Sequence, residues 1–92
     1  KLSQKMYESA ILYVKMEEYD AAVSYLKDLL ELYFDTGYAD KARLLIVDTF
    51  IVARKFEEAE TFLEENRGEF TDVAVLEEAK ILIEKNRPKE EK

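Results

Sequence analysis

The chain contains no cysteine and no histidine among its 92 residues. Their absence excludes a disulfide framework, Ser-His-Asp triads, Cys-His nucleophile pairs and ordinary zinc sites. Only two glycines are present, so there is no glycine-rich loop to cradle a phosphate and no calcium-binding loop of alternating acids around a glycine. We therefore expect no cofactor, no metal site, no catalytic residues and no enzymatic activity.

Turn-forming residues are scarce as well. Two glycines and a single proline, Pro88, are too few for the turns of a sheet protein of this length, whereas Ala, Leu, Glu and Lys are abundant. A hydrophobic fraction of 48% is enough for a core, so the chain is not a disordered acidic tail. No apolar run reaches the roughly 18 residues of a membrane span. The composition predicts one small all-α domain.

The net charge of −7 disfavours two classes of partner. Nucleic acids and anionic membrane surfaces attract basic proteins, so we expect neither nucleic-acid binding nor direct membrane insertion. An acidic surface favours a protein or peptide partner that carries basic residues beside apolar ones.

Apolar residues recur at steps of three and four along five segments, which predicts five helices. They run from about Ser3 to Met16, Asp20 to Phe34, Tyr38 to Arg54, Phe56 to Asn66, and from residue 71 or 72 to near Asn86. The third is apolar on every side between Leu44 and Val47, so we expect it to be the central element.

Turn and cap residues lie between these segments. We expect Gly37 to adopt a positive φ, Asp35 or Thr36 to cap the third helix, Gly68 to follow the fourth, and Thr71 or Asp72 to cap the fifth. Pro88 stops any continuation of the fifth helix.

One seven-residue pattern occurs twice. The segment from Glu18 to Ser24 is matched by the segment from Lys55 to Thr61, with an aromatic residue three positions before an alanine in both copies. The spacing, from Tyr19 to Phe56, is 56 − 19 = 37 residues. A helical pattern repeated at this distance is typical of stacked helical hairpins, and Ala22 and Ala59 are predicted to lie where the helices of a hairpin approach closely.

This pattern resembles the tetratricopeptide repeat. The signature positions are filled by Ala10, Tyr13, Tyr19, Ala22, Leu26 and Leu29 in the first copy and by Val47, Phe50, Phe56, Ala59 and Leu63 in the second. The resemblance implies a right-handed α-α superhelix of two hairpins (about residues 3–36 and 37–68) plus a C-terminal capping helix (about 71–86). These elements would form a single domain over residues 1–87, followed by a charged tail at 88–92.

The spacing of 37 and the segment from Leu32 to Ala39 are similar to a bacterial envelope branch of that family. This branch includes the lipoprotein of the β-barrel assembly machinery and the periplasmic partner of the Tol–Pal system. The default expectation for localisation is the cytoplasm, and the alternative implied by the branch is the bacterial periplasm in association with the outer membrane.

The resemblance also implies a binding surface, because the first helix of each repeat lines a concave groove in that family. Carried over to this chain, the groove positions are Tyr7, Ile11, Val14 and Lys15 in the first helix and Leu44, Asp48, Ile51 and Val52 in the third. The fifth helix would add Val73, Leu76, Lys80 and Ile83.

Two interpretations of this face stay open. In the first, the protein is a non-catalytic scaffold that binds a peptide or protein segment in the groove. In the second, it is a structural or assembly module: the face is filled by the fifth helix or by a second copy in a homodimer, or the chain is a fragment of a longer array, as in bacterial envelope assembly. Asp48 either pairs with Lys15 or Lys80 or contacts a cationic ligand group.

Overall fold

The computed structural model describes residues 2–34 and 37–89, which form five α-helices and a short 3-10 helix without any strand. The elements are α1 (Leu2–Lys15), α2 (Tyr19–Leu32), α3 (Gly37–Val52), α4 (Phe56–Asn66), η1 (Arg67–Glu69) and α5 (Val73–Asn86). The predicted all-α class is confirmed. The largest differences from the predicted bounds are at the ends of α2 and α3, which stop two residues early, at Leu32 and Val52.

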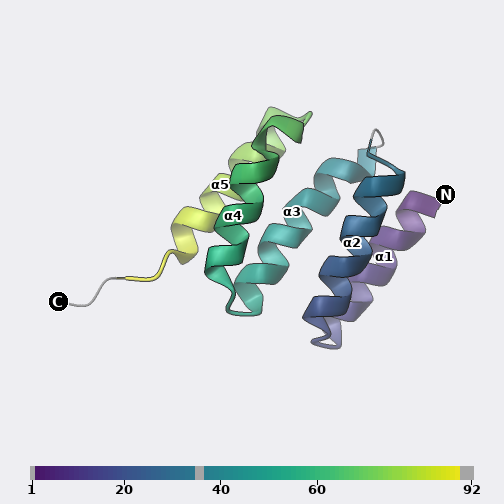
Figure 1. Ribbon diagram of the computed structural model, residues 1–92, viewed down its shortest axis with the longest axis horizontal. Coiled ribbons are helices and arrows are strands. Elements are labelled where there is room, and N and C mark those ends of the chain that lie inside the picture. Colours follow the sequence, from purple (N-terminus) through teal and green to yellow (C-terminus); the bar gives the residue numbers. More distant parts are fainter. Residues whose placement is uncertain (1, 35–36, 90–92) are drawn as a thin grey trace.

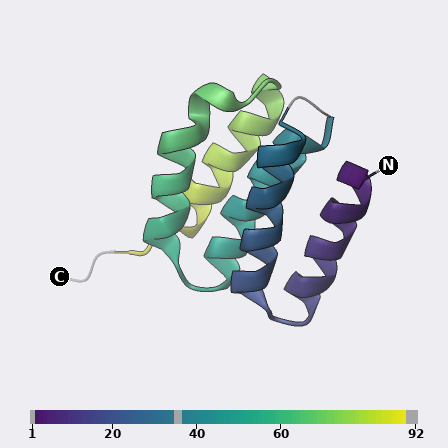
Figure 2. The ribbon, with the colours of Figure 1, turned by 45° about the vertical axis from the view of Figure 1, so that its right-hand side comes forward.

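The helices lie side by side in chain order, with α2 and α4 in front of the other three (Figure 1). Short connections make successive helices antiparallel, and the second view shows the same arrangement (Figure 2). Helix α3 contacts each of the other four helices, including both α1 and α5 in its own layer. Its apolar circumference is thereby covered on several sides, which confirms that it is the central element.

The core is built mainly from small and branched residues of these helices. The fully buried side chains include Ala10, Ala22, Leu26, Leu29, Ala42, Ile46, Val47, Ala59 and Ala79. Ala22 and Ala59, which the repeated pattern singles out, are both 0% exposed. Alanine at such positions allows two helix backbones to approach, and a larger side chain there would overpack the contact.

The turns inside the two hairpins have the same backbone geometry. Glu17 follows α1 with φ 62° and Arg54 follows α3 with φ 67°, a separation of 54 − 17 = 37 residues. In each turn, the N–H groups of this residue and of the one after it form a Schellman motif. The Glu17 and Glu18 N–H groups donate to the carbonyl oxygens of Val14 and Tyr13, and those of Arg54 and Lys55 donate to the carbonyl oxygens of Ile51 and Phe50. The 37-residue spacing of the sequence therefore recurs in the backbone.

The expectation of a positive φ at Gly37 is wrong, whereas Gly68 follows the end of α4 as expected. Neither has a positive φ: Gly37 is the first residue of α3, and Gly68 lies inside η1 because α4 tightens into a 3-10 turn. The left-handed positions belong instead to the two non-glycine residues described above. Asp72 caps α5 as expected, accepting a hydrogen bond from the Ala74 N–H at 2.9 Å.

Three expectations remain, and two of them fall at least partly on residues outside the described chain. Helix α5 ends at Asn86, ahead of Pro88. The predicted caps Asp35 and Thr36 lie outside the described residues, and so do residues 90–92 of the charged tail.

Candidate functional site

A hollow of about 430 Å³ lies between α1, α3 and α5. We call it the α1–α3–α5 groove. Its walls are Tyr7 from α1, Lys41, Leu44, Leu45 and Asp48 from α3, and Glu78, Ile81, Leu82 and Lys85 from α5. Apolar side chains form the sides, and charged groups of both signs are interspersed among them.

The lining follows the 37-residue spacing from helix to helix. Tyr7, Leu44 and Ile81 are related by 44 − 7 = 37 and 81 − 44 = 37, and all three line the groove. The same step relates Lys41 to Glu78 and Asp48 to Lys85. Three helices therefore present equivalent positions to one surface. The period of 37, applied a second time, was the sequence signal that identifies the α5 wall.

None of the four α5 residues expected at the groove is among its lining residues. Val73 and Leu76 do not line it, and Lys80 and Ile83 line a different hollow on the side of α4. The physical reason is that α5 buries Ala79 and Ile83 against its neighbours, which rotates Ile81, Leu82 and Lys85 towards the groove. Helix α5 thus forms a wall of the groove and does not fill it.

The eight positions expected on α1 and α3 divide into two groups. Tyr7, Leu44 and Asp48 come together in the groove. The other five are not among its lining residues: half-buried Ile11, Val14 and Ile51, and exposed Lys15 and Val52. Ile51 packs against the core cluster, so its apolar surface serves the interior.

Asp48 is the chemically distinctive group of the groove. It is half-buried, and burial raises the pKa of its carboxyl above the usual value. No hydrogen bond or ion pair to Asp48 occurs among the described residues, so the expected pairing with Lys15 or Lys80 is wrong. Lys80 pairs with Glu77 at 3.3 Å, because the two residues are neighbours on the same helix face.

An aromatic pair lies beside this carboxylate. The rings of Tyr7 and Tyr38 are 5.5 Å apart and tilted by 51°, and the Lys41 ammonium lies 5.0 Å from the Tyr38 ring centroid. Burial raises the pKa of the Tyr7 hydroxyl, and it is raised further by the neighbouring Tyr38 when that hydroxyl is ionised and by the Asp48 carboxylate. Tyr7 and Asp48 both line the groove, so one ligand group there can contact both.

A second acid on α3, which sequence reasoning missed, is fully used inside the protein. Asp40 is 6% exposed and accepts hydrogen bonds from the Arg43 guanidinium (2.7 Å), the Thr71 N–H and hydroxyl (both 3.0 Å) and the Asp72 N–H (2.7 Å). Arg43 also lies over the Phe70 ring, with its central carbon 5.9 Å from the ring centroid. We call these five residues the Asp40 cluster; it ties the start of α5 to the start of α3.

The electrostatics of Asp40 follow from these donors. Burial alone would raise the pKa of its carboxyl, but the backbone N–H groups of Asp72 and Thr71, the Thr71 hydroxyl and Arg43 outweigh burial and lower it. The only signal in the sequence was that Asp40 lies between Ala39 and Ala42, two alanines that prove to be buried, and three residues before Arg43.

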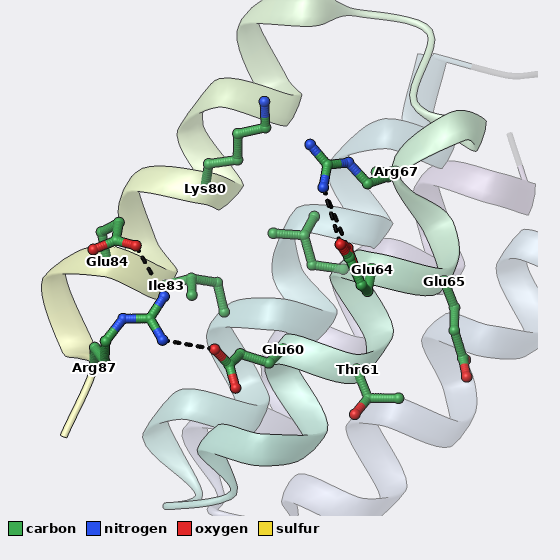
Figure 3. Close-up of a pocket in the computed structure, with 10 residues that line it drawn as sticks. Glu60, Thr61, Glu64, Glu65, Arg67, Lys80, Ile83, Glu84 and Arg87 are labelled. Atoms are coloured by element: carbon green, nitrogen blue, oxygen red, sulfur yellow. Dashed lines mark hydrogen bonds and ion pairs between the residues drawn. The ribbon is translucent and has the colours of Figure 1, made fainter.

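A larger hollow of about 850 Å³ lies between α4 and α5 (Figure 3). Its charged side chains pair with one another: Arg87 with Glu60 at 2.8 Å and with Glu84 at 2.9 Å, and Arg67 with Glu64 at 3.0 Å. Size alone therefore does not make it the better site, because its charged groups other than Glu65 already have ion-pair partners within the protein.

The 37-residue spacing relates this charged hollow to an apolar part of the core. Its residues Glu60, Arg67, Glu84 and Arg87 correspond, 37 positions earlier, to Val23, Leu30, Val47 and Phe50. Those four apolar residues belong to the core cluster or pack against it, in company with Ala59 and Phe62 of α4. The groove between α2 and α3 is thus filled by α4, whereas the corresponding groove between α4 and α5 is crossed by ion pairs.

Within residues 2–34 and 37–89, no group of three or more acidic side chains is arranged to hold a metal ion. No helix in that part of the chain has both the length and the apolar composition needed to cross a bilayer. Comparisons with protein-family models, with curated proteins and with solved structures found no match. The function is therefore inferred from the groove itself.

Proposed function

We propose that the protein is a non-catalytic scaffold that holds a peptide or protein segment in the α1–α3–α5 groove. The observation that carries the proposal is the convergence of Tyr7, Leu44 and Ile81, three equivalent positions on three helices, around half-buried Asp48, which forms no ion pair among the described residues. Exposed or half-exposed apolar side chains gathered in one hollow mark surfaces where partners dock. In such sites a few apolar anchors supply most of the binding energy, and charge sets the orientation.

The arrangement fits the tetratricopeptide-like superhelix that we propose for the two hairpins and α5. Two features support it: the identical Schellman turns at Glu17 and Arg54, and the separation of α2 and α4 from the layer of α1, α3 and α5. In this arrangement the first helices of successive repeats share one face, which is the face of the groove.

The proposal is tested by selecting a displayed library of random peptides against the protein. Leu44→Glu places a charge on the groove wall, where Leu44 is only half-buried. We expect this variant to lose binding of the selected peptides while circular dichroism shows unchanged helicity. The matched control is Leu32→Glu, at a leucine that is 64% exposed on α2 and away from the groove.

Selected peptides that bind Leu44→Glu and Leu32→Glu equally well would contradict the proposal. Unfolding of Leu44→Glu would contradict it too, because Leu44 would then belong to the core. Leu44→Ala, which removes the anchor without adding charge, provides a second variant for the same measurement.

One observation favours self-association as a second candidate function. Leu2, Leu12 and Met16 are 64%, 59% and 60% exposed, and their spacing places them on one stripe of α1 and of the turn that follows it. A second copy of the chain, packed on this edge, would cover the stripe. Scattering mass over a range of concentrations tests it: we expect Leu12→Glu to give a monomer where the unmodified chain is a dimer, and a monomeric unmodified chain contradicts this candidate.

A further inference from the structure

We propose that the groove has a subsite for a cation on an aliphatic stem, such as an arginine or lysine side chain of the partner, with Asp48 and Tyr7 contacting the cation and Leu44, Leu45, Ile81 and Leu82 contacting the stem. This inference rests on the proposed function, because it specifies which side chain of the bound segment enters the groove.

The first argument is that Asp48 lacks an internal counterion. Its carboxylate is half-buried in the groove, and burial is the cause that raises its pKa. Lys41 and Lys85 line the same hollow, but neither forms an ion pair with Asp48 in the described chain. A partly desolvated carboxylate gains most from a ligand that brings both a positive charge and hydrogen-bond donors.

The second argument concerns the walls. Leucine and isoleucine side chains from α3 and α5 flank the acid: Leu44, Leu45, Ile81 and Leu82. Long basic side chains bury their methylene stems along apolar surface while the charged end reaches a polar group. A hollow lined by these apolar side chains together with a carboxylate matches this combination, whereas a small hydrophilic cation would leave the walls uncovered.

The third argument is the aromatic pair. Tyr7 lies 5.5 Å from Tyr38, and Tyr38 already has a cation, Lys41, at 5.0 Å from its centroid. Tyrosine faces attract guanidinium and ammonium groups. Tyr7 lines the groove together with Asp48, so a cation that pairs with Asp48 also comes near an aromatic ring.

The opposite ligand charge fits poorly. Within the lining, the acids Asp48 and Glu78 offset Lys41 and Lys85, so an anionic side chain gains no net attraction from the groove. It would also approach half-buried Asp48 in a protein whose net charge is −7, and like charges repel in a partly desolvated site. The long-range field of the protein likewise attracts basic segments and raises their rate of encounter.

The test uses small probes in an NMR titration of the full chain. Butylguanidinium chloride carries the cation and the stem, N-butylacetamide carries the stem alone, and butyrate carries the opposite charge. We expect butylguanidinium to shift the amide signals of Tyr7, Leu44 and Asp48 and to bind more tightly than the other two probes. Asp48→Asn, which keeps the shape, should weaken butylguanidinium roughly tenfold because a charge-assisted hydrogen bond is lost.

The matched control is Asp28→Asn, at an exposed acid of α2, which should leave the dissociation constant unchanged. Three results would overturn the subsite: equal binding of butylguanidinium to Asp48→Asn, equal binding of N-butylacetamide, or signal shifts centred on Glu60 and Glu84 in the larger hollow.

The peptide selection separates this inference from the proposed function. Selected peptides should contain arginine or lysine beside apolar residues, and should lose affinity for Asp48→Asn. Peptides that bind the unmodified protein and Asp48→Asn equally, yet fail to bind Leu44→Glu, would leave the groove as a binding site and remove the cationic subsite.

Discussion

Asp40 and Asp48 lie on the same helix and have opposite environments. Asp40 is almost fully buried and accepts hydrogen bonds from Arg43, Thr71 and Asp72, which lower the pKa of its carboxyl despite the opposing effect of burial. Asp48 is half-buried without such donors, and burial raises its pKa. Eight residues of helix rotate a side chain by about 80° beyond two full turns, so the two acids face different neighbours.

Burial alone therefore does not determine what a buried acid does. Asp40 faces the segment that enters α5, and the N–H groups there would otherwise lack partners at a helix start. Asp48 faces a hollow. We infer that the first acid stabilises the fold and that the second, under the proposed function, contacts a ligand. Three measurements test this distinction.

The largest effect is expected for Asp40→Ala. The substitution leaves Arg43, which is 4% exposed, without its counterion, and it removes the acceptor of the Thr71 and Asp72 N–H groups. Loss of one partner of a buried ion pair lowers the free energy of unfolding by about 3–5 kcal/mol. Chemical denaturation followed by circular dichroism measures it. Asp28→Ala, at an exposed acid, should change stability by no more than about 0.5 kcal/mol, and a similarly small change for Asp40→Ala would refute the structural role.

An intermediate effect is expected in the pH dependence of stability, where the two acids act with opposite signs. Asp40 has a lowered folded pKa, so its contribution is full above the unfolded value near 3.9 and is lost as pH falls through the lowered pKa. Asp48 has a raised folded pKa, so its folded form takes up a proton first. Its contribution to stability rises as pH falls from the raised pKa towards about 3.9.

Difference curves isolate each acid from the other carboxyl groups. The unfolding free energy of the unmodified chain minus that of Asp48→Asn should increase on acidification from pH 7 to pH 4. The same difference for Asp40→Asn should be constant over that range and decrease below it. Parallel curves for both variants would mean that the two environments are equivalent.

The smallest effect is expected for Asp48→Asn at pH 7. The substitution removes a partly desolvated charge that has no ion-pair partner in residues 2–34 and 37–89, so the free energy of unfolding should rise by up to about 1 kcal/mol. Thermal and chemical denaturation at fixed ionic strength measure the change. A clear loss of stability would show that Asp48 makes a structural contact and would weaken the distinction from Asp40.

Much of the fold was accessible from sequence because its signals are local. The five helices follow from apolar periodicity, and the central place of α3 follows from the apolar run at Leu44 to Val47. The turn geometry was not accessible. Positive φ values at Glu17 and Arg54 accompany the Schellman hydrogen bonds, whereas side-chain preference had pointed to Gly37.

The groove was accessible only in part. Tyr7, Leu44 and Asp48 were expected from the family resemblance, and they do meet in one hollow. The α5 wall was missed because the orientation of that helix depends on how Ala79 and Ile83 pack against other helices. The Asp40 cluster depends on residues more than 30 positions apart, such as Asp40 and Thr71, and helix periodicity carries no information about such a contact.

The central position of α3 has a consequence for how the protein comes apart. In long helical arrays each repeat contacts only its neighbours, and unfolding can proceed one repeat at a time. Here α1, α2, α4 and α5 all pack against α3. The Asp40 cluster adds hydrogen bonds between α3 and the start of α5. Neither end can separate without exposing apolar surface of the same helix. We therefore expect this small array to unfold as a single cooperative unit.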